Sequence, residues 1–481
     1  MDDPSQPGRG TAATTGVRDR FSALTPAIES RARQVLGLDG LEAVPNALAP
    51  RAEQLWRLDG FAANIPLVNT MFIPMGPVPD TGILHEAVAL VVQRHEALRT
   101  RLTVCHRRAD QIVEGWKSAR IESVDIRNGD IEENRPGGRK SAVSEFTQAP
   151  IDLYAQDGFR CCAFRDESRK VTLGILAHGF FSDAWSSQVL RREILAVYSA
   201  LTKRESVLLG PATQYREYAQ AQRRSLDRNL GSHLSYWYER LQDAPASRLP
   251  RDHEKETARR GRSFFLIDQD TVLRLTAISE AGRVSLTLML LAAFQLSLAR
   301  WSGQLDILSS AYAADRLDPK LQRTIGFLVA SMPVRSRLDP AMGFRLFLTD
   351  LAREFYGSYA HRELSCELYE AIFSPQTPFC APVFNFVPLQ KSFSTSDMIS
   401  VPVFEGVATV PQVSRPAIFR EIYLGLIQYP GGILGKLYFN ADFFASEGVE
   451  IFIRHFQSVV REIAADPDAK LKDLLGPGIS P

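Results

Sequence analysis

The spacing of apolar residues predicts a strand-to-helix corner in the first half of this chain. The apolar run Val171–Leu176 is typical of a buried strand, and from Trp185 onward the apolar positions recur at helical spacing. The bend between these two segments carries His178 and Asp183. Such a corner suits chemistry, because the first turn of a helix presents unpaired backbone N–H groups and the positive end of its dipole.

The second half of the chain shows a similar order of elements. Apolar spacing predicts a long buried helix over Leu286–Trp301 and a strand over Ile307–Tyr312. Two apolar stretches, Ile422–Gln428 and Ile433–Phe439, flank a Pro-Gly-Gly turn and predict a hairpin. A helix that precedes both halves is expected over Arg18–Leu38. The chain therefore reads as two successive α+β units.

Length and composition are consistent with this division. A chain of 481 residues exceeds one ordinary hydrophobic core, so two domains of about 200 residues are expected. Hydrophobic residues make up 45% of the chain and charged residues 23%, which is typical of globular proteins. The formal net charge of +1 gives no support to nucleic acid or a membrane surface as the main partner.

The cysteines and the chain ends indicate a cytoplasmic protein. The five cysteines are scattered without a Cys-x-x-Cys pair, which favours reduced thiols over disulfides or a zinc site. Polar residues interrupt the apolar helix over residues 286–301, so we expect a buried helix and no membrane span. Residues 1–17 are rich in Gly, Pro and Thr, lack the apolar core of a secretory signal and are expected to be disordered.

The corner resembles the signature of the condensation domains of nonribosomal peptide synthetases, His-His-x-x-x-Asp-Gly followed by Trp-Ser. The sequence here reads His178-Gly179-Phe180-Phe181-Ser182-Asp183-Ala184-Trp185-Ser186. The first His, the Asp and the Trp-Ser pair stand at the right spacing. Gly179 replaces the second His, which the family places beside the reacting amine.

Further motifs of the same family follow in the same order. Arg94–Leu102 is similar to the second motif, Thr324–Arg335 to the Ile-Gly-x-Phe-Val-Asn-Thr-x-Pro-x-Arg motif, and Val383–Phe386 to a later strand motif. The resemblance covers residues 48–474, and no adenylation or carrier domain follows it. We therefore expect a free-standing condensation-type domain; several motifs in order are more specific than any one of them.

The resemblance implies the fold class α+β, with two chloramphenicol acetyltransferase-like lobes. Each lobe is a mixed β-sheet flanked by helices, and the two are arranged as a V with a central tunnel. The expected division is a tail over residues 1–17, a lead-in helix within 18–47, an N-terminal lobe over 48–205 and a C-terminal lobe over 206–481.

The resemblance also implies roles for individual residues. Asp183 is expected to pair with Arg316 across the two halves and so to brace the loop that carries His178 and Gly179. His178 is expected to be supportive, and Gly179 has no side chain for proton transfer. Further residues expected to line the tunnel are Ser182, Trp185, Ser186, Ser331 and Asn385.

Two other histidines are possible catalytic candidates. For His95 we favour a structural role at the end of a helix. His106 begins a second His-x-x-x-Asp spacing that ends at Asp110, but no helix follows it to supply an anion site. Neither histidine displaces the corner as the main candidate.

No metal, nucleotide or flavin motif is present, so the only prosthetic group implied is the phosphopantetheine arm of a partner carrier protein. The first hypothesis is transfer of a carrier-bound acyl or aminoacyl thioester to an amine, which forms an amide in peptide natural-product biosynthesis. The alternative is a non-catalytic platform that binds carrier-loaded substrate and recruits a tailoring enzyme. A third hypothesis is altered chemistry such as cyclisation, for which Gly179 makes room.

Overall fold

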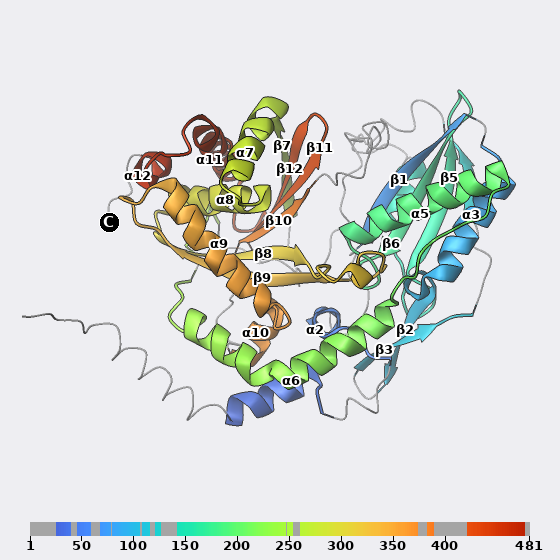
Figure 1. Cartoon of the computed structure of the whole chain (residues 1–481), viewed down its shortest axis with the longest axis horizontal. Helices are drawn as coiled ribbons and strands as arrows, with labels where there is room; N and C mark the ends of the chain where they lie inside the picture. The colour runs from blue at the N-terminus through green and yellow to red at the C-terminus, as the bar shows by residue number, and fades with distance from the viewer. Residues whose placement is uncertain are drawn as a thin grey trace, which may run out of the picture.

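The computed structural model describes residues 26–39, 46–58, 68–77, 79–105, 108–115, 121–126, 142–246, 248–253, 260–373, 382–388 and 421–476. These residues form two lobes, each built on its own β-sheet, with one long helix running beneath both (Figure 1). The predicted tail over residues 1–17 and His106 lie outside the described residues.

The N-terminal lobe has a four-stranded sheet in the order β1-β6-β5-β4. Its strands are β1 (Val68–Pro77), β4 (Ile121–Asp125), β5 (Phe159–Arg165) and β6 (Lys170–His178). The helices α3 (Thr81–Arg94) and α5 (Ala184–Lys203) pack against each other, and α5 contacts β1. A separate hairpin joins β2 (Thr100–Cys105) and β3 (Arg108–Val113), and α4 (Ala142–Gln148) precedes β5.

The C-terminal lobe has a six-stranded mixed sheet in the order β7-β12-β11-β10-β8-β9. Its strands are β7 (Arg260–Asp268), β8 (Asp306–Ala314), β9 (Val329–Arg337), β10 (Val383–Val387), β11 (Ile422–Tyr429) and β12 (Gly432–Asn440). Its helices are α7 (Gln269–Ala281), α8 (Leu286–Ser302), α9 (Phe344–Ala360), α10 (Cys366–Phe373), α11 (Ser446–Ala465) and α12 (Leu471–Leu475). The predicted hairpin is confirmed, because β11 and β12 pair antiparallel on either side of the turn.

The long helix α6 (Tyr215–Leu241) connects the lobes. Near its start, Tyr215 and Ala219 are buried in the core of the N-terminal lobe. Farther along, Leu230 and Trp237 pack with α10 in a third apolar cluster. One continuous helix thus contributes to both halves of the molecule (Figure 1).

The expected lead-in helix is observed over residues 26–36 and packs on α6 through Ala32 and Leu36. Three arginines hold its C-terminal end by donating to the carbonyls of residues 35, 36 and 37: Arg57, Arg223 and Arg108. All three also lie within ion-pair distance of the buried Glu53 on α2 (Pro50–Leu58). This end of the helix is therefore fixed to the body, since cations favour the negative end of a helix dipole.

In the described part of the chain, no single helix has the length and apolar composition of a membrane span. The helices α7 and α8 meet that criterion only as a pair, bent by 111° at the break between them.

Candidate functional site at the junction of the lobes

The predicted strand-to-helix corner is present. The central strand β6 pairs with β1 and β5 and ends at His178. Consecutive residues of β6 are buried, so both of its faces are covered, which explains its continuous apolar run. The helix α5 begins at Ala184, and Asp183 caps it by accepting a hydrogen bond from the Ser186 backbone N–H at 2.7 Å. A carboxylate at this position satisfies one of the unpaired N–H groups of the first turn.

The predicted pairing of Asp183 with Arg316 is confirmed. The Nη2 atom of Arg316 donates to Asp183 Oδ1 at 2.9 Å and to Oδ2 at 2.8 Å. Arg316 follows β8 of the C-terminal lobe, so the pair crosses from one lobe to the other. The two side chains are only 2% and 3% exposed, and water therefore screens their attraction little.

The segment 321–328 completes this junction. Arg316 Nη1 donates to the carbonyls of Leu321 and Thr324, at 2.9 and 2.7 Å. Asp183 also accepts from the Leu328 N–H at 3.0 Å. The hydroxyl of Ser186 bonds to both the N–H and the carbonyl of Gly326. The ion pair thus fixes the backbone that follows β8 and leads into β9.

His178 is held in the turn by its own surroundings. Its backbone N–H donates to the Gly158 carbonyl at 2.7 Å, and its Nδ1 accepts from the Phe180 N–H at 3.2 Å. The neutral ring therefore carries its proton on Nε2. The side chain is 1% exposed and lies 5.0 Å from the Phe180 ring, centroid to centroid. These contacts hold the ring in place, and the supporting role of His178 stays a prediction.

Gly179 is buried in the turn between β6 and α5. Its φ is not positive, unlike that of five other described glycines, Gly37, Gly76, Gly303, Gly432 and Gly476. The backbone at this position can accordingly be adopted by a residue with a side chain. The local backbone therefore does not require glycine at residue 179. The missing imidazole is a chemical difference from the family motif.

The three serines expected to line a tunnel have their hydroxyls engaged within the protein. Ser182 accepts from Asn69 at 2.8 Å and Ser331 donates to Glu367 at 2.8 Å, while Ser186 belongs to the junction. Each is at most 1% exposed. In this conformation these hydroxyls stabilise the turn and the junction and do not face open space.

The other two residues expected at the tunnel are partly exposed. Trp185 donates from Nε1 to the Gln322 carbonyl at 2.9 Å, and its ring centre lies 5.7 Å from the Arg316 guanidinium. Asn385, on β10, donates to the Tyr423 hydroxyl at 2.7 Å. Trp185 therefore covers the ion pair, and the tunnel-lining role of both residues stays a prediction.

A second buried ion pair between the halves was not predicted from the sequence. Arg51 on α2 pairs with Glu367 on α10, with Nη2 to Oε1 at 3.0 Å and Nε to Oε2 at 3.2 Å. Arg51 also donates to the Val329 carbonyl and lies over the rings of Tyr312 and Phe327. The sequence feature that could have indicated this pair is the charged residue Arg51 on the apolar face of α2.

Arg51 also favours the ionised form of the Glu367 carboxylate. Burial alone raises the pKa of Glu367, but the charge and hydrogen bonds of Arg51 and the Ser331 hydroxyl lower it below its usual value. Glu367 is therefore ionised at neutral pH.

His95 has the structural role expected for it. Its Nε2 lies 2.7 Å from Glu193 Oε2 on α5, and Arg94 contacts the same carboxylate at 3.0 Å. His95 is buried at the end of α3, so the contact ties the two helices of the N-terminal lobe together.

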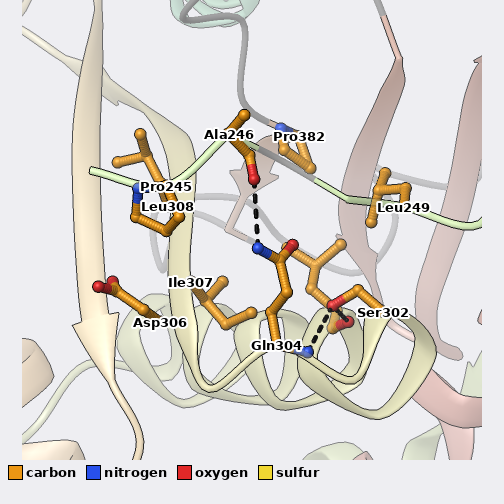
Figure 2. A pocket seen from close by; sticks show the side chains of 10 residues that line it. Pro245, Ala246, Leu249, Ser302, Gln304, Asp306, Ile307, Leu308 and Pro382 are labelled. Carbon is orange, nitrogen blue, oxygen red and sulfur yellow. Dashed lines mark hydrogen bonds between the residues drawn. The ribbon is translucent and has the colours of Figure 1, made fainter. Parts of the chain in front are cut away.

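Figure 2 shows a cavity in the C-terminal lobe, between the loop after α6 and the start of β8. The Gln304 side chain crosses it to the Ala246 carbonyl at 3.2 Å, and Asp306 at its rim is paired with Arg335 at 2.6 Å. None of the lining residues belongs to the corner. Because its polar groups bond to one another, this cavity offers a ligand few free contacts.

The described residues contain no group of three or more His, Cys, Asp or Glu side chains able to hold a metal ion. The corner instead combines a satisfied ion pair, a buried supporting histidine and a buried glycine where a proton acceptor is expected. This arrangement can position a bound group but offers no side chain at residue 179 to move a proton.

Both the sequence and the fold of this chain are similar to those of known proteins. The chain is 26% identical over 434 residues to a linear gramicidin synthase of Brevibacillus parabrevis, covering 88% of this chain and 8% of that much longer protein. The X-domain from teicoplanin biosynthesis superposes with a TM-score of 0.70 at 20% identity, over 89% of this chain and 96% of that one.

A solved complex of the X-domain and OxyB from teicoplanin biosynthesis gives a similar match, with a TM-score of 0.68 at 19% identity over 89% of this chain and 95% of that one. These structures share the fold of two sheets flanked by helices. The family model described as "Condensation domain" matches residues 70–477, most of the chain. The chain therefore belongs to the condensation domain family.

Proposed function

We propose that this chain is a non-catalytic condensation-type platform of peptide natural-product biosynthesis. It binds a substrate held as a thioester on a carrier protein and presents it to a tailoring enzyme. The observation that carries this proposal is the buried Gly179 in the place of the family's second His. The junction that braces the corner is retained, while the side chain that would handle the proton is missing.

The surroundings of Gly179 support the same proposal. His178 is buried with Nδ1 accepting a backbone N–H, and the Ser182 and Ser186 hydroxyls are bonded within the protein. None of them is placed as an activated nucleophile beside a free base. The X-domain, which has the same fold, is solved in a complex with OxyB, so the fold is compatible with recruitment of a second protein.

Amide formation by positioning is the second candidate function. The match to a peptide synthase over 88% of the chain favours it. General acid-base catalysis contributes roughly 3 to 5 kcal/mol, whereas proximity and orientation contribute about 7 to 11 kcal/mol. An already activated thioester can therefore be attacked by an amine without a protein base. An alcohol is a weaker nucleophile, so this candidate implies an amine acceptor.

Intact-mass analysis of carrier proteins decides between the two functions. A donor carrier loaded with an aminoacyl thioester and an acceptor carrier loaded with an amine are incubated with and without the protein. The platform predicts that the loaded carrier binds but that no amide forms above the spontaneous rate. Amide formation by the unchanged protein overturns the platform and establishes the transferase.

The matched variants are Gly179→His and Gly179→Phe. Both add a ring at residue 179, but only the first adds a ring nitrogen that can accept a proton. Turnover by Gly179→His alone would show that the imidazole was the missing component. Equal behaviour of the two variants, with both folded, would assign the lack of turnover to another part of the site.

A further inference from the structure

Two cationic side chains lie close together on the sheet of the C-terminal lobe. The register of β12 and β7 pairs Tyr438 with Arg262 and Lys436 with Phe264. Paired residues, and residues two positions apart on one strand, project from the same face of a sheet. Lys436 and Arg262 are consequently diagonal neighbours on one face, with a separation of about 7 to 8 Å between backbones.

That face points away from the core helices of its own lobe. The alternate residues Phe265, Ile267, Leu437 and Phe439 are buried in the core that includes α7, α8 and α11. Figure 1 shows these three helices on one side of the sheet and the N-terminal lobe on the other. Lys436 and Arg262 are thus on the side of the sheet that faces the other lobe.

Both cations lie without a counter-charge in the part of the chain that the structure describes. Among the described residues, no ion pair involves Lys436 or Arg262, and Arg262 Nη1 is buried without a hydrogen-bond acceptor. Burial lowers the pKa of Lys436 and also that of Arg262, against the smaller opposing effect of Tyr438. Desolvated charges without partners are costly, so this pair calls for a ligand that supplies the missing charge.

Apolar side chains continue the surface beside the two cations. Phe264 is 50% exposed and Leu266, two residues farther along β7 on the same face, is 57% exposed. The Arg262 guanidinium lies 5.8 Å from the centre of the Phe264 ring. A ligand with an anionic group and an attached apolar or acyl portion matches this combination.

We propose that Lys436 and Arg262 form an oxyanion-binding site on the face of the C-terminal sheet that points toward the N-terminal lobe. The oxyanion belongs to the carrier-borne ligand, so its source rests on the proposed function. Two sources have the same chemistry: the phosphate of the phosphopantetheine arm and a carboxylate on the attached acyl group. Each forms charge-assisted hydrogen bonds with an ammonium and a guanidinium.

Calorimetric titration with paired probes separates the two sources. 4′-Phosphopantetheine is compared with pantetheine, and the succinyl thioester of pantetheine with its uncharged succinamoyl counterpart. In one of these two pairs, the anionic probe is expected to bind about 10- to 100-fold more tightly than its neutral counterpart. Lys436→Met and Arg262→Gln should each remove that advantage.

The matched control is Arg274→Met, which removes an exposed cation from α7 in the same lobe and should leave both pairs of affinities unchanged. Melting temperatures confirm that each variant is folded. If anionic and neutral probes bind equally, or if the Lys436 and Arg262 variants keep the difference, the site is wrong while the platform function stands.

A second measurement tests the site if no pantetheine probe binds, a result that would count against the platform. Lysine acetylation by acetic anhydride is followed by peptide mass spectrometry with and without inorganic phosphate. Phosphate should slow acetylation of Lys436 several-fold but not that of the exposed Lys472 on α12. Equal rates at Lys436 with and without phosphate overturn the site.

Discussion

The junction at Asp183 and Arg316 differs in its charges from the face of the C-terminal sheet that carries Lys436 and Arg262, here called the inner face. The junction pairs two buried opposite charges, whereas the inner face has two half-buried cations. At the junction, Arg316 is surrounded by one carboxylate and two carbonyls that accept from it. On the inner face, Arg262 and Lys436 have no acidic partner among the described residues. A buried charge with a counter-charge fixes one backbone arrangement, whereas a charge without one favours a ligand that supplies it. The comparison therefore separates the part of this molecule that holds the lobes from the part that we infer binds.

The second bridge, Arg51 with Glu367, belongs with the junction in this comparison. Its carboxylate accepts from Arg51 and from the Ser331 hydroxyl, and Arg51 also donates to the Val329 carbonyl. Both bridges thus act on backbone between residues 321 and 331, which leads into β9. Two ion pairs therefore fix the position of β9 relative to the N-terminal lobe.

The largest expected effect is the loss of the junction carboxylate. Asp183→Ala should lower the free energy of unfolding by about 3 to 5 kcal/mol, because Arg316 is left buried without its partner. Urea denaturation at neutral pH measures this. The control is Asp80→Ala, since Asp80 is also a helix cap, with an exposed side-chain bond to the Ile83 N–H and no ion pair among those observed.

The Asp80 variant should lose only about 1 kcal/mol, the usual contribution of a cap. The difference between the two variants then reports the contacts of Asp183 across the lobes, which are the ion pair with Arg316 and the bond from the Leu328 N–H. Equal losses would show that Asp183 acts as a cap alone and would remove the basis for the bracing role.

The next effect concerns the second bridge. Glu367→Leu should cost about 3 kcal/mol, because Arg51 is left buried and uncompensated. The double variant Arg51→Met/Glu367→Leu should recover most of that loss, since a buried ion pair replaced by apolar side chains is often close to neutral. Denaturation of both variants in parallel measures the recovery, and a double variant as unstable as the single one would contradict it.

The two bridges also differ in how far the sequence could predict them. Asp183 and Arg316 were predicted as partners because Asp183 lies in the corner motif and Arg316 stands nine residues before Ile325, where the family carries the arginine that pairs with this aspartate. Arg51 and Glu367 are 316 residues apart, and no local pattern on α10 marked Glu367 as buried. Spacing along the chain specifies which residues share an element, but contacts between elements depend on how those elements pack.

The same distinction applies to the candidate site. The presence of a strand followed by a helix at the corner was predicted from apolar periodicity, and so was the hairpin of β11 and β12. The engagement of Ser186 and Ser331 in side-chain bonding did not, because their partners lie on elements distant in sequence. The diagonal placement of Lys436 and Arg262 required the register of β7 against β12.

A smaller effect is the pH dependence of the second bridge. Because the pKa of folded Glu367 lies below its unfolded value, its contribution to stability is complete above the unfolded pKa, about 4.3, and is lost as pH falls through the folded pKa. The stability difference between the unchanged protein and Arg51→Met/Glu367→Leu should shift in favour of the double variant on acidification. A difference that is constant between neutral pH and pH values well below the unfolded pKa would contradict the lowered pKa.

The smallest effect is expected on the inner face, and its sign is what matters. Lys436→Met removes a partly buried charge that has no partner, so the unfolding free energy should stay the same or rise by up to about 1 kcal/mol. Urea denaturation beside Asp183→Ala gives the contrast within one protein: removing a group from the satisfied pair destabilises it, whereas removing an unsatisfied cation does not. A clear loss of stability in Lys436→Met would mean that the folded protein already satisfies this lysine. The inner face would then belong with the structural bridges, because a charge already satisfied within the fold has no need of an oxyanion from a ligand.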